Sequence, residues 1–277
     1  MLIGGILLLA ALFAVAMGIG ADGLSWLWIA PVSFVGGVLG LAVLAFLFFW
    51  FMCQIVDQSK EQEHDSKFYR TMLALYIDAL RRVIRLHIHT KGLEKTPKDG
   101  RFMLVCNHTS LADPVILLHC FAKSQLAFIS KRENASMFLV GNAMHKILCQ
   151  PITRENDREA LKTILKCIQL IKEDEASIAV FPEGYIHPDK KLHPFRSGVF
   201  KIAQKTQVPI VVCTLKNTPQ VFTNLPKLKR TDVDLHLVDV IQPEQYAGMN
   251  TVALGNWVYQ MMAEDLGPEL VSQDAEI

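Results

Sequence analysis

The chain has 277 residues, and its 28 Lys and Arg nearly balance its 27 Asp and Glu, so the formal net charge is +1. A charge this close to zero argues against the broad basic surface of a nucleic-acid-binding protein. The six cysteines include no Cys-x-x-Cys pair. This is typical of buried thiols in a reducing compartment, and it argues against a disulfide framework and a zinc ribbon.

The first 56 residues are almost entirely apolar, with Asp22 as their single charged side chain. They divide around "ADGLSW" into two apolar stretches, residues 1–21 and 24–53. Each stretch is long enough to cross a bilayer, which takes about 20 helical residues. We therefore expect an N-terminal transmembrane helical hairpin over residues 1–56. The alternative for the first stretch is a cleaved signal peptide, because "AVA" at 14–16 resembles a cleavage site, although no base precedes it.

Basic residues are distributed unevenly around these stretches. Lys60, Lys67 and Arg70 follow the second stretch, whereas the short loop between the two has no base. Positive charge gathers on the cytoplasmic side of membrane proteins, and both alternatives leave the rest of the chain on that side. We expect an integral protein of the cell membrane whose C-terminal part faces the cytoplasm.

Residues 57–83 are predicted to form a polar linker, "DQSKEQEHD" at 57–65, and a helix. The apolar side chains on one face of this helix are Phe68, Met72, Tyr76, Ala79, Leu80 and Val83. Its arginines Arg70, Arg81 and Arg82 lie largely away from that face. Such a helix either packs on the surface of the following domain or rests on anionic lipid beside the spans.

Residues 84–277 are predicted to form one domain in which short apolar strands alternate with helices. The expected strands are residues 84–89, 102–106, 126–130, 177–181, 209–215 and 233–241, and the expected helices begin at Pro114 or lie within 158–172, 197–206 and 251–265. This order favours an α/β fold with a mixed, largely parallel sheet flanked by helices. His87 and His89 in the first strand could share a metal, but a solvated strand face explains them more simply.

The stretch "CNHTSLADP", residues 106–114, follows a predicted buried strand and carries a histidine and an aspartate five residues apart. A continuous helix would turn His108 and Asp113 about 140° apart, so the two side chains meet only across a loop. The carboxylate would then orient the imidazole, which could take a proton from a substrate hydroxyl. In the alternative, Asp113 is only the N-cap of a helix that has Pro114 at its first position.

A second polar turn, "VFPEGYIHP" at 180–188, ends another predicted strand. A plain strand-to-loop reversal would explain the Pro-Glu-Gly sequence, with Gly184 supplying an unusual backbone angle. Ligands of parallel sheets bind just beyond the carboxyl ends of the strands. The two turns together would bring His, Asp and Glu side chains to one edge of one sheet, which is more than two turns require.

These motifs resemble those of the membrane-associated glycerolipid acyltransferases, a family that includes lysophosphatidic acid acyltransferases. "NHTSLADP" is similar to the family's Asn-His-x-x-x-x-Asp block, and "FPEG" at 181–184 is similar to its third block. Residues 131–156 occupy the place of the second block, which ends in an arginine. "FRSGVFKIA" (195–203) and "VPIVVCTLKNT" (208–218) resemble the segments that follow, so that the resemblance covers residues 84–265.

The resemblance implies a role for each matching residue. His108 would be the general base and Asp113 its partner. The substrate-binding residues would be Asn107, Lys131, Arg154, Glu183 and Gly184, with Arg154 holding an acceptor phosphate and Lys131 a weaker candidate for the same role. The family commonly has Thr and Arg after Phe-Pro-Glu-Gly, whereas this chain has Tyr185 and Ile186. That departure leaves the head group of the acceptor open.

The resemblance also implies a reaction, the transfer of a fatty acyl group from acyl-CoA or acyl-carrier protein to the free hydroxyl of a lysophospholipid. The first candidate for the acceptor is 1-acylglycerol 3-phosphate, and the expected partners are these substrates and membrane lipids. No cofactor and no metal are expected, because the sequence has no helical His-x-x-x-His pair. Backbone N–H groups in the two turns are natural candidates for donors to the oxyanion. A lipid hydrolase and a non-catalytic lipid-binding relative remain as alternatives.

Overall fold

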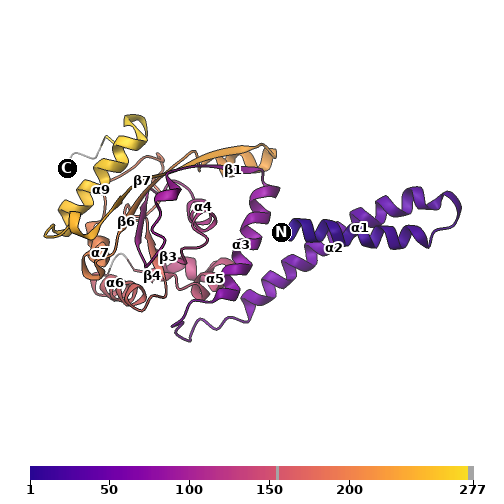
Figure 1. Cartoon of the computed structure of the whole chain (residues 1–277), viewed down its shortest axis with the longest axis horizontal. Coiled ribbons are helices and arrows are strands. Elements are labelled where there is room, and N and C mark those ends of the chain that lie inside the picture. Colours follow the sequence, from indigo (N-terminus) through magenta and orange to yellow (C-terminus); the bar gives the residue numbers. More distant parts are fainter. Residues whose placement is uncertain (154–155, 274–277) are drawn as a thin grey trace.

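The computed structural model describes residues 1–153 and 156–273, and it consists of a long helical hairpin that projects from a layered domain (Figure 1). The hairpin is formed by α1 (Leu2–Ile19) and α2 (Trp26–Gln54). The two helices cross at small residues, since a Cβ atom on Gly37 would lie 3.3 Å from the Cβ atom of the fully buried Ala10. Both helices are long and apolar enough to cross a membrane.

The hairpin is fastened to the domain through α3 (Lys67–Val83), which lies between the two (Figure 1). The Tyr69 hydroxyl donates to the Met52 carbonyl at 2.6 Å, and the Tyr76 hydroxyl donates to the Ala45 carbonyl at 2.7 Å. On the domain side, buried residues of α3 join the hydrophobic core. α3 therefore packs on the domain, as in the first of its two alternatives, and it also holds the last turns of α2.

Arg70 is half-buried, which corrects the prediction that it lies away from the packed face of α3. Its Nε atom donates to Asp65 at 2.7 Å, and its terminal nitrogens donate to the carbonyls of Leu126 and Ile147. Only 13% of the side chain is exposed. The chain around Leu126 and Ile147 covers this side of α3. A guanidinium that is largely withdrawn from water requires a carboxylate and carbonyl partners.

The domain is built on a seven-stranded sheet with the strand order β1-β7-β6-β2-β5-β3-β4. β6 and β7 are antiparallel, and every other neighbouring pair is parallel. The strands are β1 (Leu86–Lys91), β2 (Met103–Cys106), β3 (Leu126–Lys131), β4 (Gln150–Ile152), β5 (Ser177–Val180), β6 (Ile210–Lys216) and β7 (Thr231–Ile241). The mixed, largely parallel sheet expected from the sequence is confirmed.

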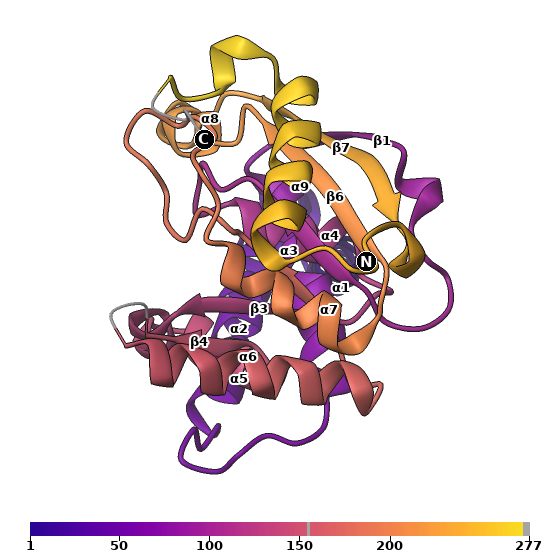
Figure 2. The ribbon, with the colours of Figure 1, turned by 90° about the vertical axis from the view of Figure 1, so that its left-hand side faces the viewer.

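Helices cover both faces of the sheet (Figure 1, Figure 2). One face carries α6 (Asp157–Lys172), α7 (Lys201–Thr206) and α9 (Thr251–Leu266), and the other carries α3, α4 (Asp113–Cys120) and α5 (Val140–Lys146). Successive side chains of a strand point to opposite faces. Met103 and Val105 of β2 therefore enter the core beneath α6 and α9, while Leu104 and Cys106 enter the core beneath α3 and α4. Burial on both faces explains why the central strands are apolar without alternation.

The short elements that the hydrophobic pattern does not predict include β4, α5 and α8 (Gln220–Asn224). β4 has three residues, one of them Pro151, and it is an edge strand, where a proline is tolerated. The helix expected over 197–206 begins as a 3₁₀ turn, Ser197–Phe200, and continues as α7. Elements this short contain too few residues to show a hydrophobic period.

Candidate active site

The two polar turns lie side by side at one edge of the sheet. His108 follows the end of β2 by two residues, and Glu183 follows the end of β5 by three. β2 and β5 are parallel neighbours, so their carboxyl ends meet at the same edge, where ligands of such sheets bind. The turns are also bonded directly, because the His108 backbone N–H donates to Oε1 of Glu183 at 2.7 Å.

His108 and Asp113 form a close pair. The Nδ1 atom of His108 is 2.9 Å from Oδ2 of Asp113, whose side chain is completely buried. The loop between the two residues brings them together, as the catalytic alternative requires. The carboxylate favours a proton on Nδ1, which leaves Nε2 as the nitrogen that can accept one.

Asp113 is not an N-cap, so that alternative is wrong. The N-cap of α4 is Ala112, with no side-chain capping bond, and Asp113 is the first residue of the helix. Its Oδ2 atom instead accepts the backbone N–H groups of Thr109 and Ser110, both at 2.8 Å. The carboxylate therefore turns back toward the loop, where the same oxygen that holds the imidazole also fixes the backbone around it.

An aromatic stack packs against one face of the imidazole and helps to orient the ring. The His108 ring lies on the Phe181 ring with centroids 4.1 Å apart and planes 16° apart, and Phe181 in turn stacks on Phe128. The Nε2 atom of His108 makes no hydrogen bond with any residue in the described parts of the chain, and 16% of the side chain is exposed. A held ring with one open nitrogen is the arrangement that a general base needs.

Glu183 connects the loop that carries His108 to the segment that follows the third block. Its Oε1 accepts the N–H of His108, and its Oε2 accepts the N–H of His193 at 3.0 Å. The residue is 2% exposed, and burial raises the pKa of its carboxyl to about 8, against the lowering effect of the two N–H bonds. Both oxygens are thus occupied by backbone, so the structure favours a positioning role for Glu183. Gly184 has φ +91°, a conformation that favours glycine.

Several backbone N–H groups of the two turns already have acceptors. The N–H groups of His108, Thr109 and Ser110 are engaged by the carboxylates of Glu183 and Asp113. The N–H of Gly184 donates to the Phe181 carbonyl at 3.0 Å. Backbone groups that already have acceptors cannot stabilise developing charge without breaking those bonds.

Asn107, which the resemblance assigns to substrate binding, connects two strands. Its side-chain oxygen accepts the N–H of Leu215 at 2.7 Å, and its amide donates to the Leu215 carbonyl at 2.9 Å. Thr109 and Thr218 make a second link between the same two loops, with their hydroxyls 2.9 Å apart. Asn107 is buried, so its geometry favours support of the catalytic loop.

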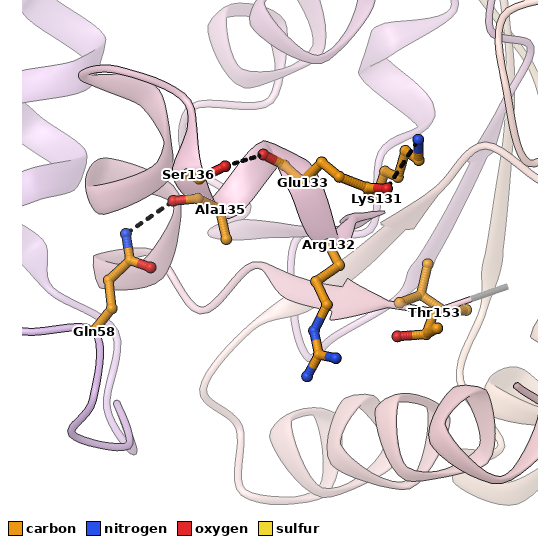
Figure 3. A pocket seen from close by; sticks show the side chains of 8 residues that line it. Gln58, Lys131, Arg132, Glu133, Ala135, Ser136 and Thr153 are labelled. Carbon is orange, nitrogen blue, oxygen red and sulfur yellow. Dashed lines mark hydrogen bonds and ion pairs between the residues drawn. The ribbon is translucent and has the colours of Figure 1, made fainter. Parts of the chain in front are cut away.

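Lys131 lies at the end of β3, beside a cavity of about 440 Å³ (Figure 3). Its amino group is paired with Glu133 at 3.0 Å, whereas the Arg132 guanidinium extends in another direction. Gln58 from the linker after α2 and Thr153 after β4 line the same cavity. Arg154, the expected phosphate ligand, lies outside the described residues.

Three residues of this region are not identified by the sequence motifs. Phe181 supports the imidazole, His193 supplies an N–H to Glu183, and Thr218 braces the loop that carries His108. Phe181 and Thr218 lie in segments that resemble the family, but the motifs give them no role. His193 acts through its backbone N–H and Thr218 through its hydroxyl, and a sequence pattern reports neither contact.

Within residues 1–153 and 156–273, no group of three or more His, Cys, Asp or Glu side chains is arranged to hold a metal ion. His89 on the exposed strand β1 is instead 2.8 Å from Oδ1 of Asp232.

Comparisons with known proteins agree with this arrangement. The family model described as Acyltransferase matches residues 87–216. The chain is 36% identical over 133 residues to the chloroplastic 1-acyl-sn-glycerol-3-phosphate acyltransferase BAT2 of Brassica napus, covering 48% of this chain and 38% of that protein. It is 30% identical over 164 residues to the probable 1-acyl-sn-glycerol-3-phosphate acyltransferase of Mycoplasma pneumoniae, covering 55% and 60%. The chain thus spans less than two thirds of the length of these curated relatives.

The fold is also similar to the crystal structure of the 1-acyl-sn-glycerophosphate acyltransferase PlsC from Thermotoga maritima, with a TM-score of 0.59 and 22% identity. The match covers 95% of this chain and 96% of that one, and at this identity it bears on the fold alone. Over residues 87–216 the chain is similar to the acyltransferase family. Within that family it resembles the 1-acyl-sn-glycerol-3-phosphate acyltransferases.

Proposed function

We propose that this protein is a membrane-anchored O-acyltransferase. It would transfer a fatty acyl group from acyl-CoA or acyl-carrier protein to the free hydroxyl of 1-acylglycerol 3-phosphate, giving phosphatidic acid. The observation that carries the proposal is the pair of His108 and Asp113 at the carboxyl edge of the sheet, with one ring nitrogen left open. The names of the curated relatives support this choice of acceptor.

In the proposed reaction, Nε2 of His108 removes the proton of the acceptor hydroxyl while its oxygen attacks the thioester carbonyl. Asp113 holds the proton on Nδ1 and stabilises the imidazolium that forms. The tetrahedral intermediate then expels the thiolate, which takes the proton from Nε2. We invoke no acyl-enzyme, since Cys106 beside the catalytic loop is fully buried and burial raises the pKa of its thiol.

The proposal also puts α1 and α2 in the bilayer and the domain on its cytoplasmic side. Support comes from the length and apolar composition of both helices. The two ends of the hairpin lie on the same side, because the Met1 amino group is 3.8 Å from Asp78 in α3 and Tyr69 in α3 bonds to Met52 in α2. A hairpin that enters and leaves a membrane on one side has this geometry.

The test is an assay of the purified full chain with labelled oleoyl-CoA and a panel of lyso-lipids. The expected product is labelled phosphatidic acid, formed only when 1-acylglycerol 3-phosphate is present. Release of labelled fatty acid without any acceptor would identify a lipid hydrolase. Binding of lipids without turnover of any donor, acyl-carrier protein included, would identify a non-catalytic relative.

A further inference from the structure

A second cavity, of about 200 Å³, lies directly beneath the third block. Phe181, Pro182 and Gly184 form one wall of it, and Gly198 and Val199 of the following 3₁₀ turn form another. Strands β3 and β4 and the first turns of α6 complete the lining. Most of these residues are apolar, and the charged side chains among the described lining residues are Arg196 and Asp157.

The backbone of Arg196 is held in the wall of this cavity by a hydrogen bond. Its backbone N–H donates to the Pro182 carbonyl at 2.8 Å, next to Glu183 in the chain. The preceding residue, Phe195, packs edge-on against Tyr259 with ring centroids 5.2 Å apart. The contact with Tyr259 therefore fixes Phe195, and the Pro182 carbonyl of the third block fixes the backbone of Arg196.

The guanidinium of Arg196 is an uncommitted cation. It makes no hydrogen bond or ion pair with any residue of 1–153 or 156–273, and the residue is exposed. Lys131, at the neighbouring cavity, is by contrast paired with Glu133. A cation without a partner next to the third block has its full bonding capacity available for a ligand.

We infer that Arg196 binds the phosphate of the acceptor and thereby selects acceptors that carry one. This inference rests on the proposed function and names the residue that sets its substrate preference. The planar fork of a guanidinium matches two phosphate oxygens at once. Pro182, whose carbonyl accepts the backbone N–H of Arg196, is followed in the chain by Glu183. The Glu183 carboxylate in turn accepts the backbone N–H of His108. A phosphate held by Arg196 would keep the attached glycerol hydroxyl close to the base.

Asp157 provides a test of opposite sign. The residue lines the same cavity, and its negative charge would repel a phosphate. Removing this charge should therefore strengthen use of a phosphate-bearing acceptor, whereas removing the charge of Arg196 should weaken it. Lys205, an exposed lysine of α7 that lines none of the cavities described above, supplies the matched control for loss of one positive charge.

The experiment is steady-state kinetics of the full chain with 1-acylglycerol 3-phosphate and with uncharged monoacylglycerol, at one fixed concentration of acyl donor. Arg196→Gln should lower kcat/KM for the phosphate acceptor by about 10- to 100-fold and leave monoacylglycerol within about twofold. Asp157→Asn should raise kcat/KM for the phosphate acceptor about two- to fivefold. Lys205→Gln should match the unmodified protein on both acceptors.

Failure of this inference is separable from failure of the proposed function. If the unmodified protein acylates neither acceptor, the proposed function fails. If it acylates them and Arg196→Gln loses equally on both, or loses no more than Lys205→Gln, Arg196 does not read the phosphate. A fall in phosphate-acceptor use with Asp157→Asn would overturn the inference in the same way.

Discussion

Asp113 holds the imidazole of His108 through the same carboxylate oxygen that gathers the loop between them. Oδ2 accepts from Nδ1 of His108 and from the backbone N–H groups of Thr109 and Ser110, all within 2.9 Å. One atom therefore sets both the shape of the loop and the orientation of the base. A carboxylate held in this position can stabilise the imidazolium that forms when the ring takes up a proton.

Replacing the base removes the proposed proton acceptor. His108→Ala should lower turnover by at least about 10²-fold, which is a typical contribution of general base catalysis. Folding should be largely intact, since the bond between the residue-108 N–H and Glu183 comes from the backbone and survives the substitution. The measurement is kcat with saturating donor and acceptor, together with the far-UV circular dichroism of the variant. A variant with near-normal kcat would remove His108 from the mechanism.

Asp113→Asn separates the two roles of the carboxylate. The amide oxygen can still accept the two loop N–H groups and Nδ1–H, so the loop should keep its shape. The negative charge is lost, so the imidazolium should form less readily and kcat should fall by about 10²-fold. Thermal denaturation and kcat are measured on the same preparation. Unchanged kcat at unchanged stability would reduce Asp113 to an acceptor for the loop backbone.

Sequence reasoning reached the pairing of His108 with Asp113 because the separation of five residues requires a loop. It could not assign all the partners of that loop. Asn107 bonds to Leu215 of β6, and Glu183 bonds to His108 in the loop after β2 as well as to His193 in its own loop. A sequence motif gives the residue type and its neighbours along the chain, whereas the bonds to Leu215 and His108 depend on which strands become neighbours in the sheet.

The titration of Glu183 should make stability depend on pH. Burial raises the pKa of its carboxyl from 4.5 to about 8, so between these values the folded protein holds a proton that the unfolded chain has lost. Folding is then favoured at low pH, and this contribution declines as the pH rises from about 4.5 to 8. Thermal denaturation at pH 5 to 9 in detergent should show a decline in Tm that Glu183→Gln lacks, because glutamine does not titrate.

The difference between the two Tm curves isolates Glu183 from the other titrating groups. Glu183→Gln should also be less stable at its best pH, because its amide group cannot accept the N–H of His108 and that of His193 together. Parallel curves across pH 5 to 8 would mean that Glu183 is ionised in the folded protein at neutral pH.

The central strands of the sheet can be predicted from the sequence, whereas the short elements β4 and α8 cannot. β2 and β5 are buried on both faces, and their continuous apolar runs identify them without knowledge of their neighbours. β4 pairs through three residues and α8 has five, too few for any period to appear. The burial of Arg70 depends on contacts with Leu126 and Ile147, residues far along the chain.

The proposed topology leads to a prediction about the chain ends. A reporter fused after Ile277 should lie in the cytoplasm, and alkaline carbonate should fail to strip the protein from membranes. The physical reason is the near absence of charge in the first 56 residues, which makes the hairpin costly to expose to water. Activity of a periplasmic or luminal reporter would contradict the assignment, since acyl-CoA would then be out of reach.

Arg154 remains the residue that the resemblance assigns to the acceptor phosphate, because Tyr185 and Ile186 replace the small hydroxyl and the cation common in the third block. Hydrogen bonds to a charged group contribute about 1.5–3 kcal/mol. Arg154→Ala should therefore lower kcat/KM for 1-acylglycerol 3-phosphate by about 10- to 150-fold. The apparent KM for the thioester should stay within about twofold. Arg154→Lys should recover only part of the loss, since an ammonium cannot bind two oxygens as a fork.

The control for Arg154 is the uncharged monoacylglycerol, whose use should be nearly unchanged in Arg154→Ala. In the alternative, Arg154 pairs with Glu155 or Asp157 at the start of a helix and contributes to folding. Loss of activity would then be equal on both acceptors and would accompany a lower Tm. If Arg154 and Arg196 hold the same phosphate, the double variant should lose less than the product of the two single losses, because the groups share one ligand. Fully multiplicative losses would mean that the two arginines act independently.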